Sequence, residues 1–368
     1  MKILYGVQAT GNGHITRARA LNQALTNLGI DVDFVFSGRE RKDFWDMEAF
    51  GDWQCYKGLT FYHESGDLKM IKTMRNNSLG QLWRDIRNLD LSPYDLIVTD
   101  FEPITAWAAR QQKRLCVGVG HQYAFSHSIP RRESDLIAAL IMKNFAPATV
   151  GLGLHWHHFN APILPPIAEI HQADEASDPN KVIVYLGFEE PEAVIQLLEP
   201  FDSHLFVFYG PFAQYESRGH IQLKPLSREG FKHDLATAGG VICNAGFELS
   251  SETIQLGKKL LVKPLHGQME QLANATALTE LGLGMSMDNL DTSIVREWLK
   301  QPEASCVLYP DVAKYIAEWI RQGDWQNDAS RFQMINELWE LTDAKGIESF
   351  IQSPSPKLQF DTALLNKA

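Results

Sequence analysis

The strongest constraint on the fold is an alternation, along the whole chain, of short apolar β-rich runs with longer helical patterns. This alternation is typical of α/β proteins in which a parallel sheet is covered by helices. The clearest helical pattern carries an apolar stripe and stops before Gly29, a residue suited to the end of a helix. The expected strands are residues 2–7, 32–37, 96–99, 115–118, 181–186, 204–209, 240–243 and 260–262, and the clearest expected helices are 14–28, 191–198, 247–255 and 269–281.

A proline-rich stretch divides these elements into two sets. It holds Pro162, Pro165, Pro166 and Pro179 together with an acidic run at residues 174–178. Neither a helix nor a sheet tolerates that many missing N–H donors. We therefore expect an N-terminal Rossmann-like domain at residues 1–160, a linker at 161–180 and a C-terminal Rossmann-like domain at 181–345. For the tail at residues 346–368, a return to the N-terminal domain is one option. Two such domains would face each other across a cleft at the carboxyl ends of their strands, where open parallel sheets bind ligands.

Composition and charge narrow the class of protein. Apolar residues make up 45% of the chain and charged residues 21%, which suits two globular cores. The net charge of −11 argues against a general nucleic-acid binder. The start, MKILYGVQAT, reads as a first strand rather than a signal peptide, and no apolar run is long enough for a membrane helix. We therefore expect a cytoplasmic protein, whose four widely spaced cysteines are free thiols.

The first expected strand leads into a glycine turn that carries a histidine. Gly11 and Gly13 allow the backbone to approach a ligand closely, and His14 stands at the start of the following helix. A neutral imidazole in this position can act as a general base, although such a histidine can also be a cap or turn residue. The turn is not a dinucleotide fingerprint, because Arg17 stands where a third glycine would be.

Two further segments of the first half end expected strands. Asp100 ends the run LIVTD, where it can orient His14 or serve as an ordinary helix N-cap before Pro103. His121 and Gln122 follow the next strand, and we expect them to bind an acceptor substrate.

The segment from residue 241 to 275 is the most informative part of the second half. A strand runs into the turn Asn244-Ala245-Gly246 and then into a helix, whose free N–H groups and positive end form a site for a diphosphate. Glu252, farther along this helix, can project a carboxylate toward a ribose diol or be a solvated helix residue. His266 lies in the next loop as a hydrogen-bonding or merely polar residue, and Glu270-Gln271 open another helix.

This segment resembles the donor-binding motif of GT-B glycosyltransferases, both of the UDP-glycosyltransferase superfamily and of the enzyme that adds N-acetylglucosamine to lipid-linked peptidoglycan precursor. The matching positions are Gly246, Glu252, Gly257, Pro264, Glu270, Gln271, Asn274 and Ala275. The resemblance implies that Glu252 binds the nucleotide ribose, that residues 244–246 face the β-phosphate and that Glu270 and Gln271 contact the transferred sugar. In the same families the first turn carries the catalytic-base histidine, here His14, hydrogen-bonded to an aspartate at the position of Asp100.

Two positions depart from the family pattern. Asn244 stands where plant members have a phosphate-binding histidine. The loop at Gly187, included among the donor-binding residues, continues into Glu189-Glu190 instead of a glycine-serine turn. Two carboxylates beside a diphosphate are unfavourable unless they turn away.

The resemblance implies an inverting, metal-independent glycosyltransferase that needs no cofactor. It would move a sugar from a nucleotide-diphosphate donor, UDP by preference, to a hydroxyl acceptor such as a cell-envelope glycan or lipid. His14 is then expected to look toward Glu252 across the cleft. A nucleotide-sugar epimerase or hydrolase of the same fold and a non-catalytic nucleotide-sugar-binding protein are the alternatives.

Two remaining segments have open interpretations. The run His155-Trp156-His157-His158 could suggest a metal site, but neighbouring histidines do not converge from one element, so a cluster at the edge of the linker is favoured. Basic and aromatic residues mix at positions 45–87, which fits either a helical lobe or a surface in peripheral contact with the inner membrane face.

Overall fold

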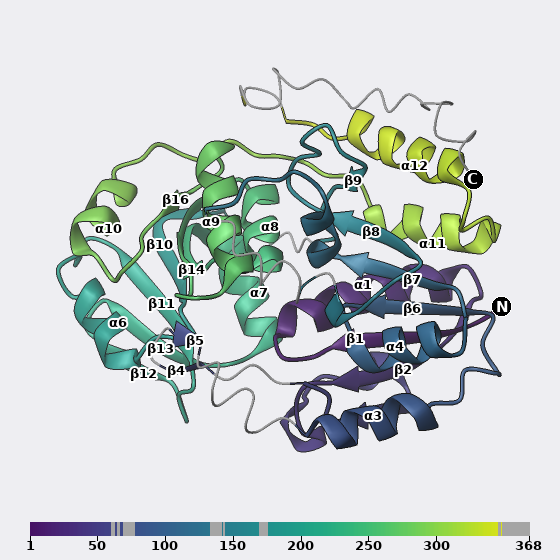
Figure 1. Cartoon of the computed structure of the whole chain (residues 1–368). Coiled ribbons are helices and arrows are strands. Elements are labelled where there is room, and N and C mark those ends of the chain that lie inside the picture. Colours follow the sequence, from purple (N-terminus) through teal and green to yellow (C-terminus); the bar gives the residue numbers. More distant parts are fainter. Residues whose placement is uncertain are drawn as a thin grey trace.

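The computed structural model describes residues 1–59, 63–64, 67–68, 78–132, 142, 144–168, 176–344 and 347. Within these residues the chain forms two seven-stranded sheets and a short pair of two-residue strands. Figure 1 shows the sheets side by side, each with its own helices. The predicted α/β class with two parallel-dominated sheets is confirmed.

The first sheet has the order β3-β2-β1-β6-β7-β8-β9, and all its neighbouring strands are parallel. Its strands are β1 (Lys2–Gln8), β2 (Asp31–Ser37), β3 (Trp53–Tyr56), β6 (Leu96–Asp100), β7 (Cys116–Gly120), β8 (Val150–Leu154) and β9 (Ile163–Leu164). The connecting helices are α1 (Asn12–Asn27), α3 (Leu79–Asn88) and α4 (Pro103–Gln111), with 3-10 turns η1 (Arg41–Asp43), η2 (Glu48–Phe50) and η3 (His121–Ser126). The separate pair is β4 (His63–Glu64) and β5 (Asp67–Leu68).

The second sheet has the order β12-β13-β11-β10-β14-β15-β16, and only the β12–β13 pair is antiparallel. Its strands are β10 (Asp178–Tyr185), β11 (Leu205–Gly210), β12 (Glu216–Arg218), β13 (Ile221–Pro225), β14 (Ala238–Asn244), β15 (Lys259–Lys263) and β16 (Met285–Ser286). Its helices are α6 (Pro191–Leu198), α7 (Arg228–Thr237), α8 (Phe247–Gln255), α9 (Met269–Glu280) and α10 (Thr292–Leu299).

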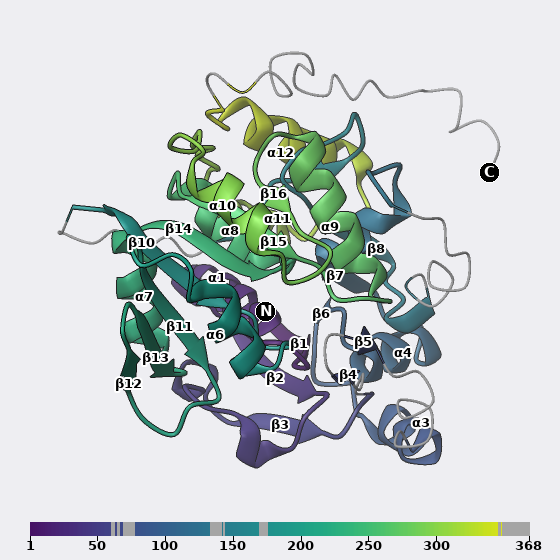
Figure 2. The ribbon, with the colours of Figure 1, turned by 90° about the vertical axis from the view of Figure 1, so that its left-hand side faces the viewer.

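Helices cover both faces of the first sheet because its strands are apolar on both sides. Along β1, Ile3 and Tyr5 join the core that includes α1, while Leu4 joins the core formed with α3 and α4. The two views agree that α3 and α4 lie on the side of this sheet opposite α11 (Val312–Gln322) and α12 (Asp328–Glu340) (Figures 1 and 2).

One buried apolar cluster runs through both halves. It contains Ile15 of α1 and Trp156 after β8 together with Val241 of β14 and Phe247 of α8. Trp156 is fully buried, and its indole nitrogen donates to the hydroxyl of Ser251, 2.8 Å away on α8. The halves therefore pack directly against each other along α1 and α8.

The chain returns to the first sheet late in the sequence. Helix α11 packs on α1, and α12 packs on β9, where the Trp339 indole nitrogen donates to the carbonyl of Ile163 at 2.6 Å. We expected such a return only in the tail at residues 346–368, which, Ile347 apart, lies outside the described residues. Within the predicted linker, β9 already belongs to the first sheet, and β10 begins at Asp178.

All eight strands and all four helices expected from the sequence are present, with ends displaced by at most three residues. Gly29 follows α1 with a φ of 72°, and its N–H donates to the carbonyl of Thr26 at 2.9 Å, which closes the helix as the sequence predicts. In the part of the chain that the structure describes, no helix is both long and apolar enough to cross a membrane.

Candidate active site

The glycine turn after β1 sets His14 at the start of α1. Gly11 is the N-cap of this helix and is exposed, with no atom within 4 Å of the position of a Cβ. At Gly13 an added Cβ would lie 2.9 Å from the carboxyl carbon of Glu248, so a larger residue there would displace the Glu248 side chain. His14 lies one turn before Arg17 on the same face of α1.

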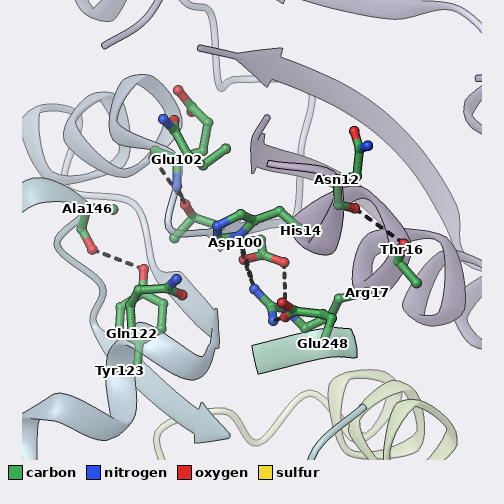
Figure 3. A network of polar contacts seen from close by, with 12 residues as sticks. Asn12, His14, Thr16, Arg17, Asp100, Glu102, Gln122, Tyr123, Ala146 and Glu248 are labelled. Carbon is green, nitrogen blue, oxygen red and sulfur yellow. Dashed lines mark hydrogen bonds and ion pairs between the residues drawn. The ribbon is translucent and has the colours of Figure 1, made fainter. Parts of the chain in front are cut away.

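His14 and Asp100 form a hydrogen-bonded pair. The ring Nδ1 of His14 lies 2.7 Å from Oδ1 of Asp100, which is fully buried at the end of β6 (Figure 3). The next residue, Phe101, has a φ of 53°, a conformation that bulky residues rarely adopt and that often accompanies functional sites. This turn lets the Asp100 carboxylate face α1 while the chain continues into α4.

The alternative role of Asp100, as an N-cap, belongs to Glu102 instead. The Glu102 side chain accepts hydrogen bonds from the N–H groups of Ile104 and Thr105, at 2.8 and 2.7 Å, and so caps α4. Burial raises the pKa of the Glu102 carboxyl, although these hydrogen bonds oppose the shift. Asp100 therefore does not cap α4, and its carboxylate contacts His14 and Arg17 of α1.

Arg17 completes the network, and sequence reasoning missed it. Its guanidinium donates two hydrogen bonds to Asp100, from Nε to Oδ2 at 2.8 Å and from Nη2 to Oδ1 at 2.6 Å. Its Nη1 donates to Glu248 of α8 (Figure 3). Only 1% of Arg17 is exposed. The signal that could have revealed it is its spacing of three residues from His14 on one helical face.

The charges in this network stabilise one another. Burial alone would raise the pKa of the Asp100 carboxyl, but Arg17 and His14 outweigh it and hold that pKa below its usual value. Burial alone would lower the pKa of Arg17, yet Asp100 and Glu248 raise it. The carboxylate beside His14 is therefore ionised and fixed in orientation.

In the second half, β14 ends at Asn244 and α8 begins at Phe247 with Gly246 as its N-cap. No side chain caps this helix, and no atom lies within 4 Å of a Cβ position at Gly246. Ala245 is fully buried, and the Asn244 amide donates to the carbonyl of Lys263 at 3.2 Å. The helix start therefore keeps backbone N–H groups that can bind an anion.

The carboxylate of α8 that reaches α1 is Glu248, one turn before Glu252. Glu252 is partly exposed on the same helix. The contact between α1 and α8 runs from His14 through Arg17 to Glu248, and the expectation that His14 looks toward Glu252 stays a prediction.

The loop after β15 holds the remaining predicted donor residues. His266 is exposed, whereas Gln271 is 94% buried and its Oε1 accepts from the N–H of Leu265 at 2.9 Å. Glu270 is contacted from the other half by Gln122, whose Nε2 lies 3.1 and 3.2 Å from the two carboxylate oxygens. Gln122 is nearly buried, and its Oε1 has no hydrogen-bond partner in the described structure.

One of the two carboxylates in the acidic loop after β10 is paired with a lysine. Gly187 is exposed, and Glu189 forms an ion pair with Lys263, its Oε1 lying 2.7 Å from Nζ without the alignment of a hydrogen bond. Both side chains are at least nine-tenths buried. The charge conflict anticipated from the sequence is therefore removed at Glu189.

His121 lies in the contact between the two halves, and its role in acceptor binding stays a prediction. It is fully buried, with Nδ1 2.8 Å from the carbonyl of Leu154 and Nε2 2.7 Å from Oδ1 of Asn274 in the other half. Its ring also stacks on Phe247 with centroids 4.1 Å apart. Burial lowers the pKa of His121. In this arrangement its atoms are occupied by the contact between the halves, because the turn after β7 points inward.

The histidines after β8 form a buried cluster next to the predicted linker. His155, His157 and His158 are at most 3% exposed, and burial lowers the pKa of His157 to about 3. Among the described residues no group of three or more His, Cys, Asp or Glu side chains is arranged to hold a metal ion.

The basic aromatic segment at residues 45–87 is only partly described. Trp45 and Trp83 are about half exposed, and Arg41 lies over the Trp53 ring at 4.1 Å. Residues 60–62, 65–66 and 69–77 fall outside the described part. The membrane-contact interpretation stays a prediction.

Comparison with known proteins agrees with this architecture. Residues 1–302 match the family model described as glycosyl transferase family 1. No curated protein matches the sequence closely enough to count as a relative.

Solved structures share the fold at low sequence identity. LpCGTa in complex with UDP superposes with a TM-score of 0.56 and 14% identity, over 92% of this chain and 98% of that one. The spinosyn rhamnosyltransferase SpnG complexed with thymidine diphosphate gives 0.53 and 13%, over 92% and 96%. The glycosyltransferase SnogD from Streptomyces nogalater gives 0.51 and 16%, over 92% and 96%.

The family model covers most of the chain, and the two facing sheets are those of solved GT-B glycosyltransferases. The chain belongs to glycosyl transferase family 1 and is a glycosyltransferase of the GT-B type.

Proposed function

We propose that the protein transfers a sugar with inversion, without a metal ion, from a nucleoside-diphosphate donor to a hydroxyl acceptor. The observation that carries the proposal is the His14–Asp100 hydrogen bond of 2.7 Å, set beside the uncapped start of α8 from the other half. The first supplies a base and the second supplies positive potential, which are the two requirements of this reaction.

His14 acts as the base. With Nδ1–H donating to Asp100, the lone pair on Nε2 accepts the proton of the acceptor hydroxyl. The acceptor oxygen then forms a bond to the anomeric carbon from the face opposite the leaving group. The bond from that carbon to the phosphate oxygen breaks, and its electron pair leaves with the nucleoside diphosphate.

The start of α8 binds the diphosphate. The turn at residues 244–246 turns the N–H groups of the helix toward the leaving oxygens, and this fixed field stabilises their growing charge. Glu252 binds the ribose, and Gly11, Gly13, Gly187 and His266 line the donor side. Glu270 and Gln271 contact the sugar.

Donor and acceptor are proposed only as classes. The solved relatives bound to UDP and thymidine diphosphate support a pyrimidine nucleotide, and UDP is our choice. The motif shared with the peptidoglycan-precursor N-acetylglucosaminyltransferase supports a cell-envelope glycan or lipid acceptor that Gln122 contacts. Such an acceptor agrees with a cytoplasmic enzyme in peripheral contact with the membrane through segment 45–87.

The test begins with thermal-shift screening of UDP- and dTDP-sugars, followed by nucleotide release with a panel of glycan and lipid acceptors. His14→Ala should keep donor binding by calorimetry while transfer falls by at least about a hundredfold. His204→Ala is the control, since His204 precedes β11 at the amino end of its sheet. Unchanged turnover in His14→Ala would reject the base. Rapid conversion of the donor without an acceptor would favour a hydrolase or epimerase, and loss of transfer with EDTA would reject metal independence.

A further inference from the structure

We propose that Arg17 is a positioning residue that links the state of the His14–Asp100 pair to the docking of helix α8. The inference rests on the proposed function only where turnover is measured. Its structural basis is a single buried guanidinium that contacts His14 and Asp100 in one half and Glu248 in the other.

The geometry around Nδ1 of His14 defines what Arg17 does. Nδ1 lies 2.7 Å from Oδ1 of Asp100 and 3.0 Å from Nη2 of Arg17. Nη2 itself donates to the same Oδ1 at 2.6 Å. Because a guanidinium has no acceptor, Nδ1 cannot donate to both neighbours, and its proton goes to the carboxylate. Arg17 thus holds Oδ1 in place for His14 while setting a positive charge next to the ring.

That positive charge opposes protonation of His14. In a plain histidine-aspartate pair the carboxylate alone stabilises the imidazolium. Here the same carboxylate is already shared with Arg17 through two hydrogen bonds. Only the neutral imidazole can accept the proton of an acceptor hydroxyl.

Glu248 tunes this effect from the other half. Its carboxylate balances the charge at Nη1 of Arg17, and Glu248 lies in the first turn of α8, two residues after the N-cap Gly246. With α8 docked, the positive charge on Arg17 is balanced and His14 can take the acceptor proton. Without the Glu248 carboxylate, the unbalanced charge on Arg17 would make the imidazolium costly and the base weak. Proton removal is thus coupled to the presence of the donor-binding helix.

Other titratable groups around the network do not mask the effect near neutral pH. They are Tyr5 of β1, Tyr123 of η3 and His121, which interacts with Glu248 and with Glu270 of α9. Burial raises the pKa of both tyrosines well above its ordinary value and lowers that of His121. Neither tyrosine therefore ionises near neutral pH, and the lowered pKa of His121 favours its neutral form there.

The test needs no substrate. In protein with 13C-labelled histidine, the ring Cε1–H signal of His14 is assigned by comparison with His14→Gln and followed against pH by NMR. Arg17→Gln should raise the pH at the midpoint of this titration by about one unit, a tenfold gain in proton affinity. Glu248→Gln should move the midpoint in the opposite direction, because it leaves the Arg17 charge unbalanced. Arg17→Lys keeps the charge and should stay near the wild-type midpoint.

Opposite shifts in Arg17→Gln and Glu248→Gln support the proposal, and unmoved or parallel midpoints overturn it. If Arg17→Gln fails to fold, Glu248→Gln decides alone, since its side chain is 19% exposed and keeps its shape. With a working transfer assay, the acid limb of kcat/KM should shift as the NMR midpoints do. Absence of transfer in the wild type would defeat the proposed function and leave the NMR result standing.

Discussion

Replacement of Gly13 by alanine tests how closely α1 and α8 approach. A Cβ at this position would lie 2.9 Å from Cδ and 3.2 Å from Cγ of Glu248, and closer still to one carboxylate oxygen. Glu248 would have to swing away and release Arg17. Loss of one partner from a buried ion pair costs about 3–5 kcal/mol, and we take about 2–3 because Asp100 remains bound to Arg17.

A second effect has the opposite sign. Alanine is favoured over glycine within a helix by up to about 1 kcal/mol. The net expectation for Gly13→Ala is therefore a destabilisation of about 1–2 kcal/mol. Gly80→Ala is the matched control, because Gly80 is also the second residue of its helix and has no atom within 4 Å of the Cβ position. It should be neutral or stabilising.

The assay is urea unfolding followed by tryptophan fluorescence, with the midpoints of both variants compared with wild type. The Glu248→Ala background supplies the second half of a double-mutant cycle. Without the Glu248 side chain, Gly13→Ala should behave like Gly80→Ala. If Gly13→Ala stabilises the protein as Gly80→Ala does in both backgrounds, the close contact between the helices does not exist in solution.

Three further predictions concern buried groups. Lys263→Met should destabilise the protein by about 3 kcal/mol in urea unfolding because it leaves the Glu189 carboxylate buried and unpaired; adding Glu189→Gln should recover most of the loss, and no recovery would contradict the ion pair. Trp156→Ala should cost about 3–5 kcal/mol, since it empties a fully buried site and removes the hydrogen bond to Ser251, and a cost under about 1 kcal/mol would refute its place in the core. Burial lowers the pKa of His157 to about 3, below the unfolded value near 6.5. The free energy of unfolding is therefore unaffected by this residue above about pH 6.5, and it falls by about 1.4 kcal/mol per pH unit as the pH drops from there toward 3. The urea midpoint should therefore drop between pH 7 and 5, and His157→Gln should flatten that drop; an equal slope in both proteins would reject the assignment.

The sequence predicted the elements that local pattern determines. Strands such as residues 2–7 and helices such as 247–255 have apolar periodicity and turn residues that act over a few positions. The glycine turns were also visible, because a glycine requirement is local. The pairing of His14 with Asp100 came from a family resemblance, and the structure places the two within hydrogen-bond distance.

Contacts between distant segments were not predictable in the same way. In the sequence, Arg17 was noted only as the residue that replaces the third glycine of a dinucleotide motif. Its contacts with Asp100 and Glu248 depend on the end of β6 and the start of α8 lying close together in the fold. His121 was expected to bind an acceptor because it follows a strand, and nothing in the sequence indicated that its ring stacks on Phe247 of the other half. Charge pairs such as Glu189 with Lys263 join loops 74 positions apart, a distance at which a single sequence carries no pairing signal.

The return of α11 and α12 to the first sheet has a consequence for how the protein is made. Helix α1 emerges from the ribosome long before the helix that packs on it, which is formed by residues 312–322. Since chains grow at about 5–20 residues per second, the apolar surface of α1 that α11 covers stays exposed for many seconds during synthesis. The later lobe, whose strands and helices are contiguous at residues 178–299, can close first. Nascent-chain stalling before residue 312 should therefore yield a protease-sensitive first lobe, and separate production of the halves will succeed only if the cut leaves α11 with the partner it covers.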